Sequence, residues 1–275
     1  MRSLCAIVAA LLVGASGAAP AHAGSPDVYD WSGAYVGAFA GAGFGSSSLT
    51  TAVDCTVSGV LCDPYPHYLN NGALIGETAS GRATGTAFTG GLFAGGNWQS
   101  GGIIYGLEAD FGAMPLSLGV GGSASTLNLG LYNGGTPSVF TVQAEASTDW
   151  LATGRVRVGF VPTPRLLVYG TAGIAATELT VSNSYSDTFN NGVGTGNVES
   201  STRGEVRTGL VLGVGAEWAL AARWRLRAEY LHTDFGAVTT TGISTYLPQV
   251  PSSNPITSTA NLRVDLIRFG LAYRF

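Results

Sequence analysis

Polar and apolar residues alternate with a period of two in several parts of the chain. From Arg223 to Tyr230, charged residues occupy the odd positions and apolar or aromatic residues occupy the even positions. Successive side chains of a β-strand point to opposite sides, so this period predicts a strand with one polar and one apolar face. The segment Ile267–Phe275 repeats the pattern, with Arg268 and Arg274 opposite its apolar face.

Strand character recurs in eight segments, and the connections between them alternate strictly between long and short. The long connections cover residues 46–86, 114–147, 180–202 and 236–261, and the short ones cover residues 100–101, 162–164 and 220–221. Tight periplasmic turns and longer external loops are typical of barrels in the bacterial outer membrane. The sequence therefore predicts an all-β fold: an eight-stranded antiparallel up-and-down transmembrane β-barrel with four long external loops and three short periplasmic turns. The predicted strands are Trp31–Gly45, Ala87–Gln99, Gly102–Ala113, Thr148–Val161, Arg165–Leu179, Arg203–Ala219, Ala222–Phe235 and Leu262–Phe275; the faces of the first are not assigned.

Alternation alone does not say which face meets lipid, because a soluble barrel of the lipocalin type would place the apolar face inside. Aromatic residues near the strand ends favour the membrane barrel, as does a content of charged residues of only 11%, against about 25% in soluble proteins. An arginine on the lipid face costs about 2–4 kcal/mol at the bilayer midplane. We therefore expect a charge network in the lumen, made of Glu108, Asp110, Arg155, Arg157, Glu205, Arg207, Glu217, Arg225, Arg227, Glu229 and Arg268.

The start of the chain has the features of a secretory signal peptide. Arg2 supplies the positive charge, Leu4–Val13 is a short apolar run, and Ala21-His22-Ala23 is a cleavage motif before Gly24. We expect residues 1–23 to be the signal peptide and residues 24–275 the barrel domain, located in the cell outer membrane of a Gram-negative bacterium. Beyond the signal, no apolar run is long enough for a transmembrane helix.

Cys55 and Cys62 are the two cysteines of the expected mature chain, and the exported context is oxidising. A disulfide between them is predicted. A zinc site would need more ligands than His67, the nearest histidine, so no metal residues are assigned. The basic residues are all arginine, the formal net charge is −4, and no basic patch exists, so a nucleic-acid partner is not expected.

Several short segments, in order along the mature chain, resemble the opacity-protein-like porin family of small outer-membrane barrels of alphaproteobacteria. They are Trp31–Gly37, Gly95–Gln99, Tyr105–Phe111, Asp149–Gly159, Leu167–Ala175 and Arg268–Phe275. The resemblance implies an assembly signal for the barrel-insertion machinery in the last strand, carried by Phe269, Leu271, Tyr273 and Phe275. Outer-membrane lipid and lipopolysaccharide are the other expected partners, and a partner for the external loops is not identified. The long first loop, with its two cysteines, departs from the family pattern.

The interior of an eight-stranded barrel is just wide enough for side chains to fill. The leading interpretation is therefore a structural and surface-interaction protein with a mostly closed, charge-paired lumen, not an enzyme, with no cofactor and no catalytic residues. Alternatives are a small-solute pore or a haem- or ligand-binding barrel, for which Tyr65 and His67 are candidate haem ligands. Further alternatives are a soluble lipocalin-like carrier and an enzyme acting on outer-membrane lipid, for which His232-Thr233-Asp234 is the candidate site.

Overall fold

The computed structural model describes residues 29–56, 61, 71–126, 138–188, 197–246 and 250–275. The predicted signal peptide, Cys62, Tyr65 and His67 lie outside these residues. Eight strands form a closed barrel in which each strand pairs antiparallel to the next and the last pairs with the first, as predicted. The elements are β1 Gly33–Val53, α2 Asn71–Thr78, β2 Gly81–Ser100, β3 Ile103–Thr126, β4 Ser138–Thr163, β5 Leu166–Asp187, β6 Asn197–Ala219, β7 Trp224–Tyr246 and β8 Val250–Arg274.

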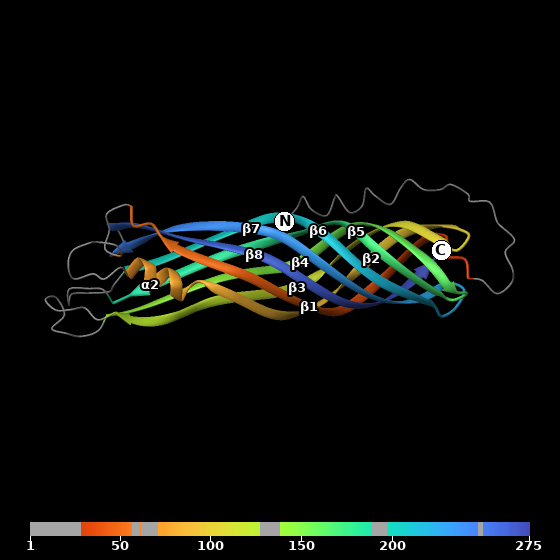
Figure 1. The fold of residues 1–275 in the computed structure, drawn as a ribbon, viewed down its shortest axis with the longest axis horizontal. Helices are drawn as coiled ribbons and strands as arrows, with labels where there is room; N and C mark the ends of the chain where they lie inside the picture. Colours follow the sequence, from red (N-terminus) through yellow and green to blue (C-terminus); the bar gives the residue numbers. More distant parts are fainter. Residues whose placement is uncertain (1–28, 57–60, 62–70, 127–137, 189–196, 247–249) are drawn as a thin grey trace.

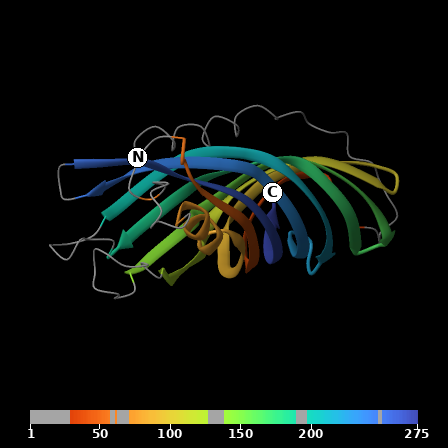
Figure 2. The same cartoon turned by 60° about the vertical axis from the view of Figure 1, so that its left-hand side comes forward.

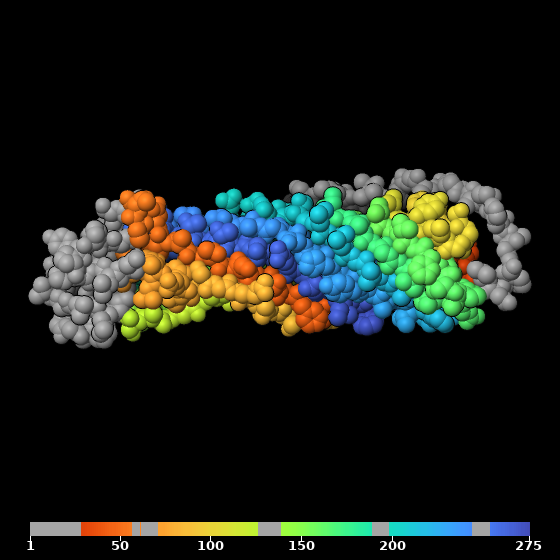
Figure 3. Space-filling view, viewed as in Figure 1, coloured from red at the N-terminus to blue at the C-terminus, as the bar shows by residue number. Residues whose placement is uncertain are grey.

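The barrel is elongated, with the short turns and the C-terminus at one end and α2 at the other (Figure 1). Figure 2 shows the strands running at a slant, and Figure 3 shows the same elongated outline with side chains filled in. The short helix α2 was not expected from the sequence. It contacts β1, and its Ile75 is buried beside Phe140 and Ile256 in a small apolar cluster. Among the described residues, no helix is long and apolar enough to cross a bilayer.

The strands begin or end near the predicted positions at the short turns but extend much further at the other end. β3 continues to Thr126, where the sequence pattern ended it at Ala113, and β7 continues to Tyr246, where the pattern ended it at Phe235. The strands contain 20 to 26 residues. A transmembrane strand needs about 9–11 residues, so about half of each strand lies outside the bilayer.

The outer surface of the barrel changes character along its axis, and this change defines two zones. In the half next to the short turns, the outward side chains are large and apolar and form a band that matches the lipid-facing band of outer-membrane barrels; this half is the membrane zone. In the half next to α2, the projecting zone, outward positions carry mainly Ser, Thr, Gly and charged residues. The exposed residues of the band include Phe88, Leu92, Trp98, Leu107, Phe111, Val156, Val158, Phe160, Ile174, Leu210, Leu212, Trp218, Leu226, Tyr230, Ile267 and Phe269.

Two strands contain local irregularities close to the boundary between the zones. On β4, Asp149 and Trp150 both face outward between the buried residues Thr148 and Leu151, and the register with β5 shifts there. On β7, Gly236 has a positive φ of 67°, and both it and Ala237 are exposed. Such bulges place an extra residue in one strand and interrupt the strict alternation of the two faces.

The wall between β6 and β7 is not paired along its whole length. The two strands pair at Asn197 and Val198 and again from Leu210 onward, and no paired residues join them in between. Over the same stretch, β6 remains paired with β5. One seam of the projecting zone is therefore held without a continuous hydrogen-bonded ladder.

Candidate functional site: the interior of the barrel

The lumen of the membrane zone contains a buried network of arginines and carboxylates, as the alternation in the strands predicts. The members come from β3, β4, β6, β7 and β8, and each is at most 6% exposed. Unpaired charges at such sites would be very costly, whereas paired and hydrogen-bonded charges are tolerated. The network consists of Glu108, Asp110, Arg155, Arg157, Glu217, Arg225, Arg227, Glu229 and Arg268.

Glu108 lies at the centre of the network. Arg155 Nη2 donates to its Oε1 at 2.6 Å, and Arg227 donates to both of its oxygens, with Nη1 to Oε1 at 2.9 Å. Arg157 Nη1 donates to Oε2 at 3.2 Å, and the hydroxyl of Tyr35 donates to the same oxygen at 2.8 Å. One carboxylate therefore joins side chains of β1, β4 and β7 to β3.

A second group of contacts lies around Arg268. This guanidinium donates to Asp110 Oδ1 at 3.1 Å and to Glu229 Oε2 at 2.6 Å. Arg155 also reaches both carboxylates, at 2.8 Å and 2.9 Å, and so links this group to Glu108. The hydroxyl of Thr153 donates to Asp110 at 2.7 Å. Each carboxylate of the network thus accepts hydrogen bonds from at least two arginines, and such charge-assisted bonds are the strong kind.

Aromatic rings line the space between the charges. The guanidinium carbon of Arg157 lies 3.9 Å from the ring centroid of Tyr169, that of Arg227 lies 4.1 Å from Phe93, and that of Arg268 lies 4.3 Å from Phe39. These are cation–π contacts, which gain strength when water is excluded. Phe39 and Tyr35 on β1 also assign the faces of the first strand, which the sequence pattern left open.

Glu205 and Arg207 were predicted to join the network, and the structure places them elsewhere. They lie on the stretch of β6 that is not paired with β7, where Arg207 Nη1 is 3.1 Å from Glu205 Oε1. Both side chains are about one-third exposed. The prediction extended the charged face of the sixth strand beyond the membrane zone, where charges can remain in contact with water.

In the projecting zone the interior is mainly apolar, although the carboxyls of Asp187 and Glu199 are also buried there. On β3 the inward residues change from Glu108 and Asp110 to Met114, Leu116 and Leu118, which are almost fully buried. The same cluster includes Leu49, Ala144, Ala146, Leu179, Val181, Phe235, Val238, Leu262 and Val264. The outward residues of the same strand change in the opposite direction, from exposed apolar side chains in the band to Ser117 and Ser123. The projecting zone therefore has the polarity of a soluble barrel, and the membrane zone has the reverse.

The outer wall of the projecting zone carries hydroxyl pairs between neighbouring strands. Thr239 and Thr259 lie 2.9 Å apart between their hydroxyl oxygens, and Thr241 and Thr257 lie 3.0 Å apart. Ser123 with Thr141 and Ser182 with Thr202 form similar pairs. Cross-strand pairs of this kind stabilise a sheet whose outer face is in water.

A small apolar plug fills the barrel at the end with the short turns. Trp31 is fully buried there beside Ile104, Leu167 and Tyr169, and Tyr29 packs against the group. The plug is anchored by the backbone N–H of Trp31, which donates to Gln99 Oε1 at 2.9 Å. The charged layer is thus bounded by apolar side chains on both sides.

The residues of the candidate lipid-modifying site do not converge. His232 Nδ1 is 2.8 Å from Asp265 Oδ1, whereas the hydroxyl of Thr233 points inward to the carbonyl of Val264, and Asp234 pairs with Arg263 at 2.8 Å. Consecutive residues of a strand face opposite sides, so Thr233 points away from His232 and Asp234, and these two outward side chains pair with Asp265 and Arg263 of β8. Among the described residues, no group of three potential ligands could hold a metal ion.

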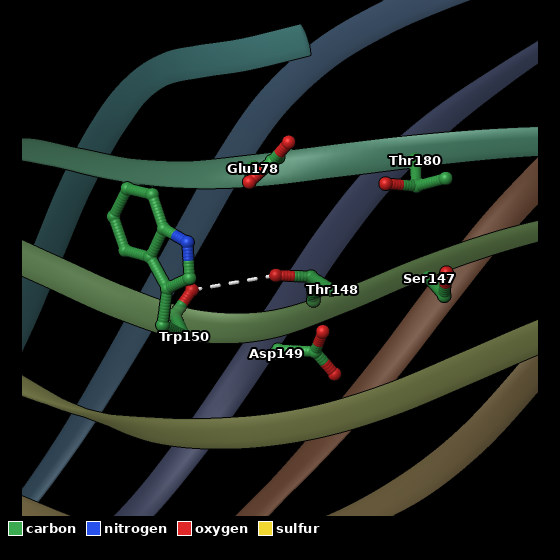
Figure 4. A pocket seen from close by; sticks show the side chains of 6 residues that line it. All are labelled: Ser147, Thr148, Asp149, Trp150, Glu178 and Thr180. Carbon is green, nitrogen blue, oxygen red and sulfur yellow. Dashed lines mark hydrogen bonds between the residues drawn. The ribbon is translucent and has the colours of Figure 1, made fainter. Parts of the chain in front are cut away.

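A shallow surface pocket of about 160 Å³ lies at the β4 bulge (Figure 4). Its lining residues are Ser147, Thr148, Asp149, Trp150, Glu178 and Thr180. The hydroxyl of Thr148 donates to the carbonyl of Trp150 at 3.3 Å, so the pocket is bordered by the distorted backbone itself. The position is at the outer edge of the apolar band, beside Phe111, whose ring centroid is 5.9 Å from that of Trp150.

The remaining predicted residues are also placed. Phe269, Leu271 and Phe275 are exposed on the outer face of the C-terminal strand and its end, and the ring centroid of Tyr273 lies 5.1 Å from that of Trp224. Cys55 is disulfide-bonded, as expected for an exported chain. Cys62 lies outside the described residues, so its part in that bond stays a prediction.

Comparisons with known proteins agree with this arrangement. Residues 7–275 match the family described as the outer membrane protein beta-barrel domain. The chain belongs to this family. It is 30% identical over 213 residues to the 31 kDa outer-membrane immunogenic protein of Brucella melitensis, and the aligned region covers 76% of this chain and 73% of the relative. It is 32% identical over 161 residues to the 22 kDa outer membrane protein of Rhizobium leguminosarum bv. viciae, 58% of each chain.

Among solved structures, the outer membrane protein OprG of Pseudomonas aeruginosa matches with a TM-score of 0.43 and 12% identity, over 90% of this chain and all of that one. As a member of the outer-membrane barrel family, the protein resides in the bacterial outer membrane. The family and the exposed apolar band together exclude the soluble lipocalin-like alternative for the whole chain, although the projecting zone has that polarity.

The sequence interpretation missed the projecting zone, although a signal for it exists. Leu116, Leu118 and Val120 alternate with Ser and Gly, and Phe140, Val142 and Ala144 alternate with polar residues. The composition of both runs, which is rich in Gly, Ser and Thr, indicates loops instead. The period of two was the better guide there.

Proposed function

We propose that this protein is a sealed outer-membrane barrel that presents a rigid, hydroxyl-rich wall and its connecting segments at the cell surface. The observation that carries the proposal is the filled interior: an apolar plug, a charged layer and a long apolar cluster follow one another along the axis. Arg227 and Glu108 join opposite walls through the middle of this space. Such an interior supports a structural and surface-interaction role rather than a diffusion pore or an enzyme.

Further support comes from the relatives. The name of the Brucella relative describes an immunogenic outer-membrane protein, a description that fits exposure at the surface. Neither curated relative described above is named as an enzyme. The apolar band would contact lipid, the polar rim above it would contact lipopolysaccharide, and the outward aromatic residues of β8 would be read by the barrel-insertion machinery.

Conductance in planar bilayers tests the sealed interior. The refolded protein is expected to give no stable channels. A matched variant, Leu118→Gly with Met114→Gly, thins the apolar cluster but keeps the charged layer and the plug, so it is also expected to give no stable channels. Large, stable channels in the unmodified protein would contradict the proposal.

Surface labelling tests the projecting zone. The chain contains no lysine, so a single introduced lysine can report its location through a membrane-impermeant amine reagent. Thr239→Lys, on the projecting wall, is expected to label in intact cells, and Gly102→Lys, at a short turn, only after lysis. The unmodified protein gives the background from its terminal amine, and labelling in the reverse order would contradict the orientation.

A further inference from the structure

The buried network in the membrane zone, the charged layer, contains five arginines but only four carboxylates among the described residues, so it has one excess positive charge. Its arginines are residues 155, 157, 225, 227 and 268, and its carboxylates are residues 108, 110, 217 and 229. Every arginine but Arg225 contacts two or more carboxylates. Arg225 has one such contact, at 3.2 Å to Glu217 Oε2, and Glu217 is shared with Arg157 and Arg227. The excess charge therefore lies at Arg225.

Arg225 is fully buried and has donors without partners. Its Nε and Nη2 make no hydrogen bond with the protein, and both are inaccessible. The indole Nε1 of Trp31, another fully buried side chain, also lacks a partner. A guanidinium and an indole N–H can only donate hydrogen bonds, and a buried donor without an acceptor destabilises the folded protein.

These unpartnered groups lie at the same end of the lumen. The guanidinium carbon of Arg225 is 5.7 Å from the ring centroid of Trp31, whose ring is in turn 4.8 Å from that of Tyr29. The hydroxyl of Tyr29 is also buried without a partner. Burial raises the pKa of this phenol, and Arg225 is the charge that opposes the rise most strongly. The Tyr29 hydroxyl therefore remains a protonated donor close to Arg225.

We propose that a small monovalent anion of halide size binds between Arg225 and Trp31, at the inner face of the periplasmic plug. Such an ion accepts hydrogen bonds from Arg225 Nη2 and Trp31 Nε1 and neutralises the excess charge of the layer. A water molecule satisfies the donors but leaves the charge, and Asn97 Oδ1, an unpartnered buried acceptor near Trp31, is the group that would favour water. The anion would hold the Tyr29–Trp31 segment in the mouth of the barrel.

Bromide is the probe for this site. Thermal unfolding of the refolded full-length mature chain in detergent is measured against bromide concentration, at constant ionic strength, with gluconate as the large replacing anion. A saturable rise of the midpoint is expected for the unmodified protein and for Arg223→Met, a control at an exposed arginine two residues away. Arg225→Met is expected to show no bromide dependence. An equal or non-saturating rise in all three proteins would show a general salt effect and overturn the proposal.

A second variant and a direct measurement cover the case in which Arg225→Met does not fold. Trp31→Phe keeps an aromatic ring at this position but removes the indole N–H, so the bromide concentration for half the effect is expected to rise several-fold. Anomalous diffraction from bromide-grown crystals is expected to show a peak within hydrogen-bond distance of Arg225 Nη2. A water without anomalous signal at that place would overturn the proposal, as would an empty site.

Discussion

Arg227 on β7 and Glu108 on β3 meet across the lumen in a two-point ion pair, with Nη1 2.9 Å from Oε1 and Nη2 bonded to Oε2. In a ring of eight strands, β3 and β7 are four places apart and so form opposite walls. The pair therefore braces the barrel across its width and occupies the space through which a solute would pass.

The two partners are expected to differ in their contributions to stability. Glu108→Gln leaves five arginines facing three carboxylates and should cost about 3–5 kcal/mol, the cost of breaking a buried pair. Arg227→Met leaves four of each and should cost less. Urea unfolding from lipid vesicles, followed by tryptophan fluorescence, measures both variants and the double variant. The exposed pair is the control: Arg203→Gln should change the free energy of unfolding by about 0–1 kcal/mol. Equal losses for Glu108→Gln and Arg227→Met would contradict the charge count.

The two zones predict opposite tolerance of charge along a single strand. Val156 on β4 faces lipid and is 52% exposed, so Val156→Arg should cost about 2–4 kcal/mol near the midplane. Gln143 is an outward residue of the same strand in the projecting zone, and Gln143→Arg should change stability by about 0.5 kcal/mol at most. Vesicle unfolding of both variants gives the comparison. Similar costs at the two positions would show that the bilayer covers the whole strand.

The projecting zone should depend on its apolar interior as a soluble domain does. Leu118 is 1% exposed within the large cluster, and Leu118→Ala should cost about 2–5 kcal/mol. Ser125→Ala, on the outward face of the same strand, should be nearly neutral. Protease resistance of the projecting zone in reconstituted vesicles reports the loss locally, and unchanged resistance of Leu118→Ala would argue against a packed interior.

Glu199 gives the projecting zone a dependence on pH. Burial raises the pKa of this carboxyl above that of a free glutamate, so folding favours the protonated form. Its contribution to stability is complete below the ordinary pKa and is lost as the pH rises through the raised value. Glu199→Gln should therefore be more stable than the unmodified protein at about pH 8 and equal to it at about pH 3.

Asp54 provides a control of opposite sign for this measurement. Hydrogen bonds from the Thr56 hydroxyl and backbone N–H lower the pKa of the Asp54 carboxyl. Its contribution is present above the ordinary pKa and is lost as the pH falls through the lowered value. Asp54→Asn should thus be slightly less stable than the unmodified protein at neutral pH, whereas Glu199→Gln should be more stable. Both differences in stability should disappear in acid. Thermal midpoints across the pH range separate the two, and a stabilising Asp54→Asn at neutral pH would contradict the assignment.

The membrane zone could be predicted from the sequence because lipid imposes a strong pattern on it. Arg225, Arg227 and Glu229 had to face inward, and their partners followed from the same period in other strands. The limits of that prediction coincide with the bulges: the fourth predicted strand began at Thr148 and the seventh ended at Phe235, where two adjacent residues face outward. In the sequence alone, a break in the alternation looks like the end of a strand, because the neighbouring strand that continues the pairing beyond the bulge is not visible.

Other features depend on contacts that the sequence does not display. Glu205 and Arg207 stay out of the network because they lie where β6 and β7 are not paired. The sequence of β6 alone does not show where its pairing with β7 is interrupted. The role of Trp31 as a plug depends on the closure of the barrel around it. The eight-residue helix α2 lies in a connection whose composition indicated only a loop.

The reversal of polarity along the strands has a consequence for biogenesis. The tips of the strands carry inward apolar residues that are shielded from water only when neighbouring strands pair around them, and in the proposed orientation they reach that state on the far side of the bilayer. The membrane zone needs the opposite surroundings, with lipid against its outward apolar side chains. In the proposed orientation, assembly therefore has to deliver unfolded, hydroxyl-rich hairpin tips across the membrane before the barrel can close, and the last stage of maturation takes place outside the cell.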